Sequence, residues 1–190
     1  ALSGEFVRVA DAVAPAVGVP TTAAPFSFSY NARTDNFAAA NAYYQCDRFF
    51  RMVRDLGFPL ASYFDGTTFP VQVDHRGFGG NVVNARCPGD GTGDGIGTLE
   101  FALADLSDTG NPLGIAADWR VVLHELGGHG ILWDHVNSPN FGFAHSAGDS
   151  MAAILNDPAS GAPDRFVTFP WVAIGRRHDR TPAAGWGWGG

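Results

Sequence analysis

The feature that most limits how this chain can fold is a pair of adjacent glycines, Gly127 and Gly128, in the middle of a predicted helix. Asp118 can cap the start of this helix, which is predicted to run to about Asp134. Its apolar residues recur at helical spacing, at Val121, Val122, Leu126, Ile131 and Leu132. Each glycine costs a helix up to about 1 kcal/mol. The pair therefore needs a structural reason.

Two histidines flank the glycines in His124-Glu125-Leu126-Gly127-Gly128-His129, which is similar to the zinc-peptidase motif H-E-x-x-H with one extra residue. In the shorter motif, four residues place both imidazoles within about 40° of each other on the helix. Five residues leave them about 140° apart, so an undistorted α-helix cannot aim both rings at one ion. Either the motif is accidental, or the helix contains a π-bulge that closes it on a metal, and the two glycines suit such a bulge.

A catalytic zinc site needs a third protein ligand and keeps its fourth position for water. His145 and Asp149 lie four residues apart on a helix predicted over 144–155, so His145 can bind the metal while Asp149 orients a ligand imidazole. His135 is the rival ligand, because it follows His129 at the spacing of the metzincins. Leu132 stands where metzincins have a glycine, and this favours His145.

The rest of the chain predicts an α+β fold with a mixed sheet. Apolar residues at helical spacing predict a long helix over 36–56, with Gly57 after its end. Alternating residues predict strands at 69–75 and 99–103. Prolines restrict roughly the first thirty residues to short extended pieces.

Composition indicates one globular domain over 1–190, since 45% of the residues are hydrophobic. The net charge is −7 and basic residues do not cluster, which argues against a nucleic-acid partner. No apolar run reaches the ~20 residues of a membrane helix. Asp90 and Asp94, in a glycine-rich loop, offer weak support for a calcium site. Cys46 and Cys87 could form a disulfide if the chain is exported.

Over about residues 36–155 the chain resembles the gluzincin metallopeptidases of the thermolysin and fungalysin type. The resemblance rests chiefly on the His-Glu-His element, and more weakly on the helix that precedes it and on Val73-Asp74-His75 with the Gly-Asp loop that follows. It implies a zincin-like fold in which a mixed sheet is joined to an active-site helix and a following ligand helix. It also implies export, and it leads us to expect that the family's C-terminal helical lobe lies outside this sequence.

The resemblance assigns zinc to His124 and His129, the general base to Glu125, and the aspartate that orients a ligand to Asp149. The chain departs from the family at the third ligand, where His145 replaces a glutamate. Three histidines and a water are a sound catalytic zinc set. The expected function is a zinc-dependent endopeptidase acting on peptides or proteins. The alternative is a non-catalytic zinc-binding or inactive peptidase-like domain.

Overall fold

The computed structural model describes residues 1–22, 27–91, 94–136, 143–156, 160–161 and 163. It contains both helices and strands, and only helices follow the last strand, which is consistent with the predicted α+β class. The elements are β1 (Val7–Val9), α1 (Asp35–Asp55), α2 (Leu60–Tyr63), β2 (Val71–Asp74), η1 (Phe78–Gly80), β3 (Ala85–Arg86), β4 (Leu99–Phe101), η2 (Ile115–Ala117), α3 (Trp119–His124), η3 (Glu125–Gly130), α4 (Ile131–Val136) and α5 (Ala144–Asn156).

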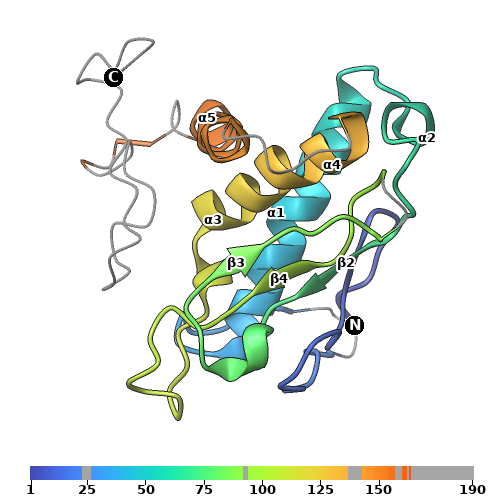
Figure 1. Ribbon diagram of the computed structural model, residues 1–190. Helices are drawn as coiled ribbons and strands as arrows, with labels where there is room; N and C mark the ends of the chain where they lie inside the picture. The colour runs from blue at the N-terminus through green and yellow to red at the C-terminus, as the bar shows by residue number, and fades with distance from the viewer. Residues whose placement is uncertain (23–26, 92–93, 137–142, 157–159, 162, 164–190) are drawn as a thin grey trace.

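The sheet has four strands in the order β1-β2-β4-β3. β1, β2 and β4 are parallel, whereas β3 pairs with β4 in the antiparallel direction. Helix α1 packs against β1 and β2, and the run formed by α3, η3 and α4 passes beside β3 (Figure 1). β3 therefore lies at the edge of the sheet that is nearest to the histidine motif.

Helix α1 confirms the helix predicted over 36–56, with a difference of one residue at each end. The Thr34 hydroxyl accepts a hydrogen bond from the Phe37 backbone N–H and so caps the first turn. Gly57 follows the last turn with a φ of 95°, a conformation that glycine adopts without a steric penalty. The buried face of α1 then anchors the core.

The core joins the inner face of α1 to the sheet and to α3. Phenylalanine rings from four parts of the chain meet edge to face, including Phe50 with Phe64 at 5.5 Å and with Phe69 at 5.0 Å between ring centroids. Such aromatic contacts stabilise beyond the area that they bury. Cys46 and Cys87 are buried in the same core as free thiols, so the structure contains no bridge between them.

The predicted strands are shorter in the structure, and the predicted helices are close to their expected limits. β2 occupies the central part of the run 69–75, and β4 occupies the first three residues of the run 99–103. The Asp118 carboxylate accepts from the Arg120 N–H at 2.8 Å, which confirms its expected role as a helix cap. The helix predicted over 144–155 is α5. Within the described residues, no helix combines the length and apolar character that a membrane crossing requires.

His75, directly after β2, is fully buried. Within the described residues, neither of its ring nitrogens has a hydrogen-bond partner. Its neighbours are charged, since Asp74, Asp35 and Arg76 all lie close enough to act on its pKa. Burial is nevertheless the largest influence and lowers the pKa of His75, so the folded chain favours the neutral ring.

Candidate metal centre

The helix that carries the histidine motif changes its winding within the motif. α3 ends at His124, the six residues of η3 form a π-helical turn, and α4 continues as an α-helix from Ile131. A π turn makes room for one extra residue in a helix. The prediction of a π-bulge at Gly127 and Gly128 is therefore confirmed.

Helix α5 crosses η3 at a point where only glycine leaves enough room. A Cβ atom on Gly128 would lie 2.5 Å from the Ala144 carbonyl oxygen and 2.8 Å from the Gly148 Cα. A Cβ on Gly148 would in turn lie 3.0 Å from the His124 Cα. The two backbones are thus in direct contact, and this contact brings the side chains of α5 onto the histidine motif.

Three imidazoles meet at this crossing. The Nε2 atom of His124 lies 3.1 Å from the Nδ1 atom of His145, and the Nε2 atom of His129 lies 3.3 Å from the same nitrogen. One ligand atom from each residue lies within 4.8 Å of the others. Among the described residues, this is the one group of three or more metal-type side chains that comes together.

Two of the three distances between these nitrogens are compatible with ligands of one tetrahedral ion. Zinc binds histidine nitrogen at about 2.0–2.1 Å, which places two ligand nitrogens on one ion roughly 3.3 Å apart. The two short distances around His145 Nδ1 match that value. Hydrogen bonds between the rings have similar lengths, but a proton on His145 Nδ1 could point well at only one of the two nitrogens. Three nitrogen donors suit zinc and other imidazole-binding transition metals.

Asp149 holds the first of these rings in place. Its Oδ1 atom lies 2.7 Å from His124 Nδ1, on the side of the ring away from His145. A carboxylate in this position keeps the proton on Nδ1 and leaves the Nε2 lone pair facing the cluster. His145 and Asp149 lie four residues apart on α5, so the helix delivers both side chains to the same place.

Glu125 is buried beside the cluster, with only 5% of its surface exposed. This burial raises the pKa of Glu125 to about 7, although the charge of His124 and a hydrogen bond from the Cys87 backbone both act to lower it. A carboxyl group with this pKa can take up and release a proton near neutral pH. Such a pKa is typical of a general base or acid.

His129 has a lowered pKa. Burial lowers the pKa of His129 to about 4, and the neighbouring His145 and His124 lower it further in the same direction. The ring is therefore neutral at pH 7 in the metal-free chain. A neutral imidazole is the form that binds a metal.

The structure places the rival ligand His135 away from the cluster. Its ring packs against the rings of Tyr63 and Phe64, at 4.6 and 5.4 Å between centroids. Asp90, from the loop considered for calcium, belongs to no group of three or more metal-type side chains among the described residues. Residues 92–93 of this loop lie outside the described part of the chain. Calcium at this loop stays a prediction.

Sequence reasoning missed two features of the site. Gly148, between His145 and Asp149, sets how closely α5 approaches α3. A glycine inside a predicted helix was the available signal, because such a residue often marks a close packing contact. The second is the contact of Cys87 with Glu125. No sequence pattern predicts that Cys87 lies close to Glu125, because the two residues are far apart in the chain.

The sequence matches no model of a protein family, and neither the curated proteins nor the solved structures give a match.

Proposed function

We propose that this chain is a zinc-dependent endopeptidase with a zincin-like fold, in which His124, His129 and His145 hold the metal. One observation carries the proposal. Three ligand nitrogens from two helices converge within 4.8 Å, and the buried Glu125 directly follows one of these ligands, His124, in the chain. The π turn supports it further, because it gives the extra residue of the motif a structural role.

In such a site zinc supplies a Lewis acid that polarises a substrate carbonyl and lowers the pKa of water. Glu125 is the general base: its carboxylate takes a proton from the attacking water and later gives it to the leaving amine. The water oxygen forms the new bond to carbon as the C–N bond breaks, and the products are a carboxylate and an amine. Asp149 keeps His124 in the tautomer that can bind metal.

The substrate would lie in an extended form along β3. This strand ends the sheet order and pairs with β4 alone among the described strands. η3, which carries Glu125, packs beside it. A peptide added to the outer edge of β3 would pair its backbone with the strand and so present a peptide bond to the cluster.

The first test is metal content, measured by elemental analysis after reconstitution at pH 7.5. Wild type is expected to bind about one zinc per chain, and His145→Ala is expected to lose it. His135→Ala is the matched control and should keep its zinc, since His135 packs against Tyr63 instead. A wild-type chain that binds no zinc would refute the proposal.

The second test concerns Glu125. Glu125→Gln is nearly the same size and cannot accept a proton as a base, so it should keep zinc and lose peptide hydrolysis. Retained turnover would remove Glu125 from the base role. Zinc bound by a wild-type chain that cleaves no peptide would instead support a non-catalytic domain.

A further inference from the structure

Strand β3 contains one residue whose backbone groups face away from the sheet. The Ala102 N–H donates to the Asn84 carbonyl oxygen at 3.0 Å, so these two residues form a hydrogen-bonded pair between β3 and β4. Along antiparallel strands such pairs alternate with pairs whose N–H and C=O groups point outwards. Ala85 and Phe101 are the next pair and belong to the second kind. The N–H and C=O of Ala85 therefore face the outer edge of the sheet.

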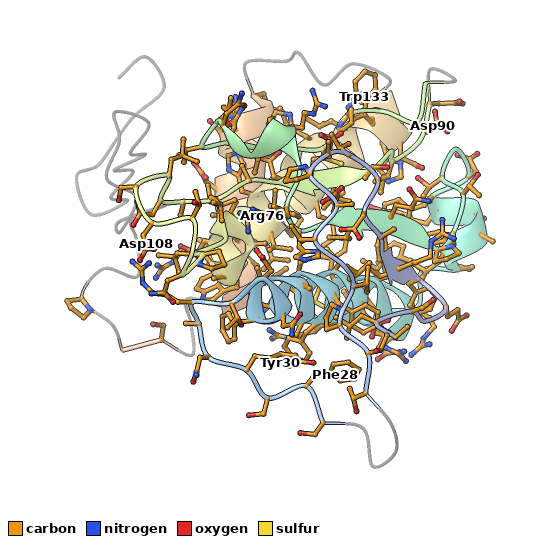
Figure 2. All side chains as sticks on the ribbon, turned by 90° about the horizontal axis from the view of Figure 1, so that it is seen from below. Phe28, Tyr30, Arg76, Asp90, Asp108 and Trp133 are labelled. Carbon is orange, nitrogen blue, oxygen red and sulfur yellow. The ribbon has the colours of Figure 1, made fainter. Side chains whose placement is uncertain are left out.

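The next residue with this orientation, Cys87, is already bonded at the outer edge. Its carbonyl oxygen accepts from the Trp133 indole N–H at 3.0 Å. Gly89 lies so close to this indole that a Cβ atom there would be 2.8 Å from two ring atoms. Figure 2 shows Trp133 at the same end of the molecule as Asp90, which follows Gly89 in the loop. α4 thus closes one end of the edge, whereas the outward groups of Ala85 have no partner among the described residues.

The side chain of Arg86 lies on the face of the sheet opposite the core. Side chains alternate between the two faces of a strand, and Ala85 packs against the core. The Nε and Nη2 atoms of Arg86 donate to Oε2 of Glu100, at 3.0 and 2.8 Å. The guanidinium carbon also lies 5.0 Å from the centroid of the Phe78 ring. These contacts hold the guanidinium in place, and its Nη1 atom takes part in neither bond to Glu100.

The two charges of this ion pair are unequally exposed. The Arg86 side chain is 54% exposed and the Glu100 side chain only 6%. The cation stands on the edge strand, and the anion lies one strand further in, on β4. A ligand at the outer edge of β3 therefore meets the positive end of a fixed dipole. This local charge is opposite in sign to the net charge of the chain, which is −7.

We propose that Arg86 is a specificity-determining residue that selects peptides with Asp or Glu next to the residue that pairs with Ala85. Side chains directly opposite each other on paired strands point to the same face, with Cβ atoms about 4.5–5.5 Å apart. A peptide bonded to the Ala85 backbone thus brings a neighbouring side chain beside the guanidinium, where a carboxylate accepts a charge-assisted hydrogen bond from Nη1. The inference rests on the proposed function, because it takes the ligand to be a peptide at the edge of β3.

The test measures peptide binding separately from cleavage. Zinc-loaded Glu125→Gln is titrated into short fluorescein-labelled peptides that carry one Glu, Gln or Lys at each position in turn, and fluorescence anisotropy gives the Kd. The same peptides in quenched fluorescent form give kcat/KM with the wild-type chain.

The variants change Arg86 and its surroundings. Arg86→Gln is compared with Arg54→Gln, which removes the same charge from an exposed position of α1. Arg86→Gln leaves the buried Glu100 without its cation, so a double variant, Arg86→Gln with Glu100→Gln, is made as well. Ala85→Pro removes the outward N–H, and an edge strand tolerates proline at such a position. Zinc content and urea unfolding show that each variant is folded.

At the preferred position, the Glu peptide should bind about fivefold more tightly than the Gln peptide, which is the gain from one exposed ion pair. Added salt should reduce this ratio. The ratio should fall to about one in Arg86→Gln and in the double variant, and it should persist in Arg54→Gln. Ala85→Pro should weaken the binding of every peptide by up to about tenfold, the loss of one hydrogen bond.

Equal Kd values for Glu and Gln peptides at every position would overturn the proposal, and so would a preference that survives the loss of Arg86 in folded variants. Unchanged affinity in folded Ala85→Pro, or no binding of any peptide, would overturn it too. The proposed function fails separately. If wild type cleaves no peptide while Arg86 still sets their affinity, the peptide site on β3 stands without hydrolysis. Cleavage without an acidic preference keeps the hydrolysis and removes the role of Arg86.

Discussion

The close contact between η3 and α5 predicts outcomes of different size for substitutions at two neighbouring glycines. A methyl group on Gly128 would lie 2.5 Å from the Ala144 carbonyl oxygen, whereas ordinary contact begins at 3.4 Å. The two backbones would have to separate by about 0.9 Å. Gly127→Ala is the matched control, since its methyl meets the Met151 side chain rather than backbone. Both variants bring the same change in helix propensity, worth up to about 1 kcal/mol in favour of alanine.

The separation caused by Gly128→Ala would move His145 and Asp149 away from His124. The nitrogen distance of 3.1 Å between His124 and His145 would grow to about 4 Å, too long for one tetrahedral ion. We therefore expect zinc affinity to fall by 10-fold to 100-fold or more, the range seen when metal-site support is lost. Overpacking should also cost about 1–3 kcal/mol of folding free energy.

The assay is zinc titration against a chromophoric chelator, with urea unfolding of the metal-free chain in parallel. Gly128→Ala should lose both affinity and stability. Gly127→Ala should lose less of each, because a rotamer change of Met151 relieves the contact with its Cγ, and the contact left with its Cβ, at 2.9 Å, needs a smaller shift of α5. Wild-type affinity in Gly128→Ala, together with raised stability, would refute the reasoning. It would mean that helix propensity, rather than close backbone contact, decides the outcome at this position.

Further predictions concern other buried groups. Gly148→Ala should weaken zinc binding by the same mechanism, and Ser150→Ala, on an exposed position of α5, should not; equal affinities in a chelator titration would contradict this. Burial lowers the pKa of His75, so the unfolded chain, with a histidine pKa of about 6.5, takes up the proton first as the pH falls. The stability that depends on a neutral His75 is therefore complete above about pH 6.5 and is lost on acidification. His75→Leu should lose less stability than wild type between pH 7.5 and 5.5, by up to about 1.4 kcal/mol per pH unit in urea unfolding, and parallel pH profiles would contradict it. Burial raises the pKa of both Cys46 and Cys87, so Ellman's reagent at pH 8 should label them only after unfolding; rapid labelling of the folded chain would show that they are accessible.

The long helices could be predicted because their apolar residues repeat over several turns, as in α1 and α5. The shortest strand, β3, could not be predicted from a repeat of this kind. β3 has two residues, Ala85 and Arg86, and is a strand only because β4 pairs with it. A run that short carries no periodicity, so its existence depends on the tertiary structure.

In the candidate site, too, residue spacing predicted the local features, whereas the features that depend on tertiary contacts could not be predicted. Spacing alone placed His145 and Asp149 on one helix face, and it required a distorted turn between His124 and His129. Spacing did not decide between His145 and His135. That outcome depends on a glycine contact that admits α5 and on aromatic rings that hold His135 elsewhere, and both involve residues far apart in the chain.

The π turn also sets the rotational phase between the two halves of one continuous helix. Removing one residue from it would turn everything beyond by about 100° and draw it back by about 1.5 Å. His129 would then stand at the ordinary four-residue spacing from His124. The Trp133 side chain would then point away from Cys87, and the hydrogen bond from its indole N–H to the Cys87 carbonyl oxygen would be lost. The extra residue therefore couples the histidine motif to the edge strand, and the motif cannot be shortened without a compensating change in how α4 packs.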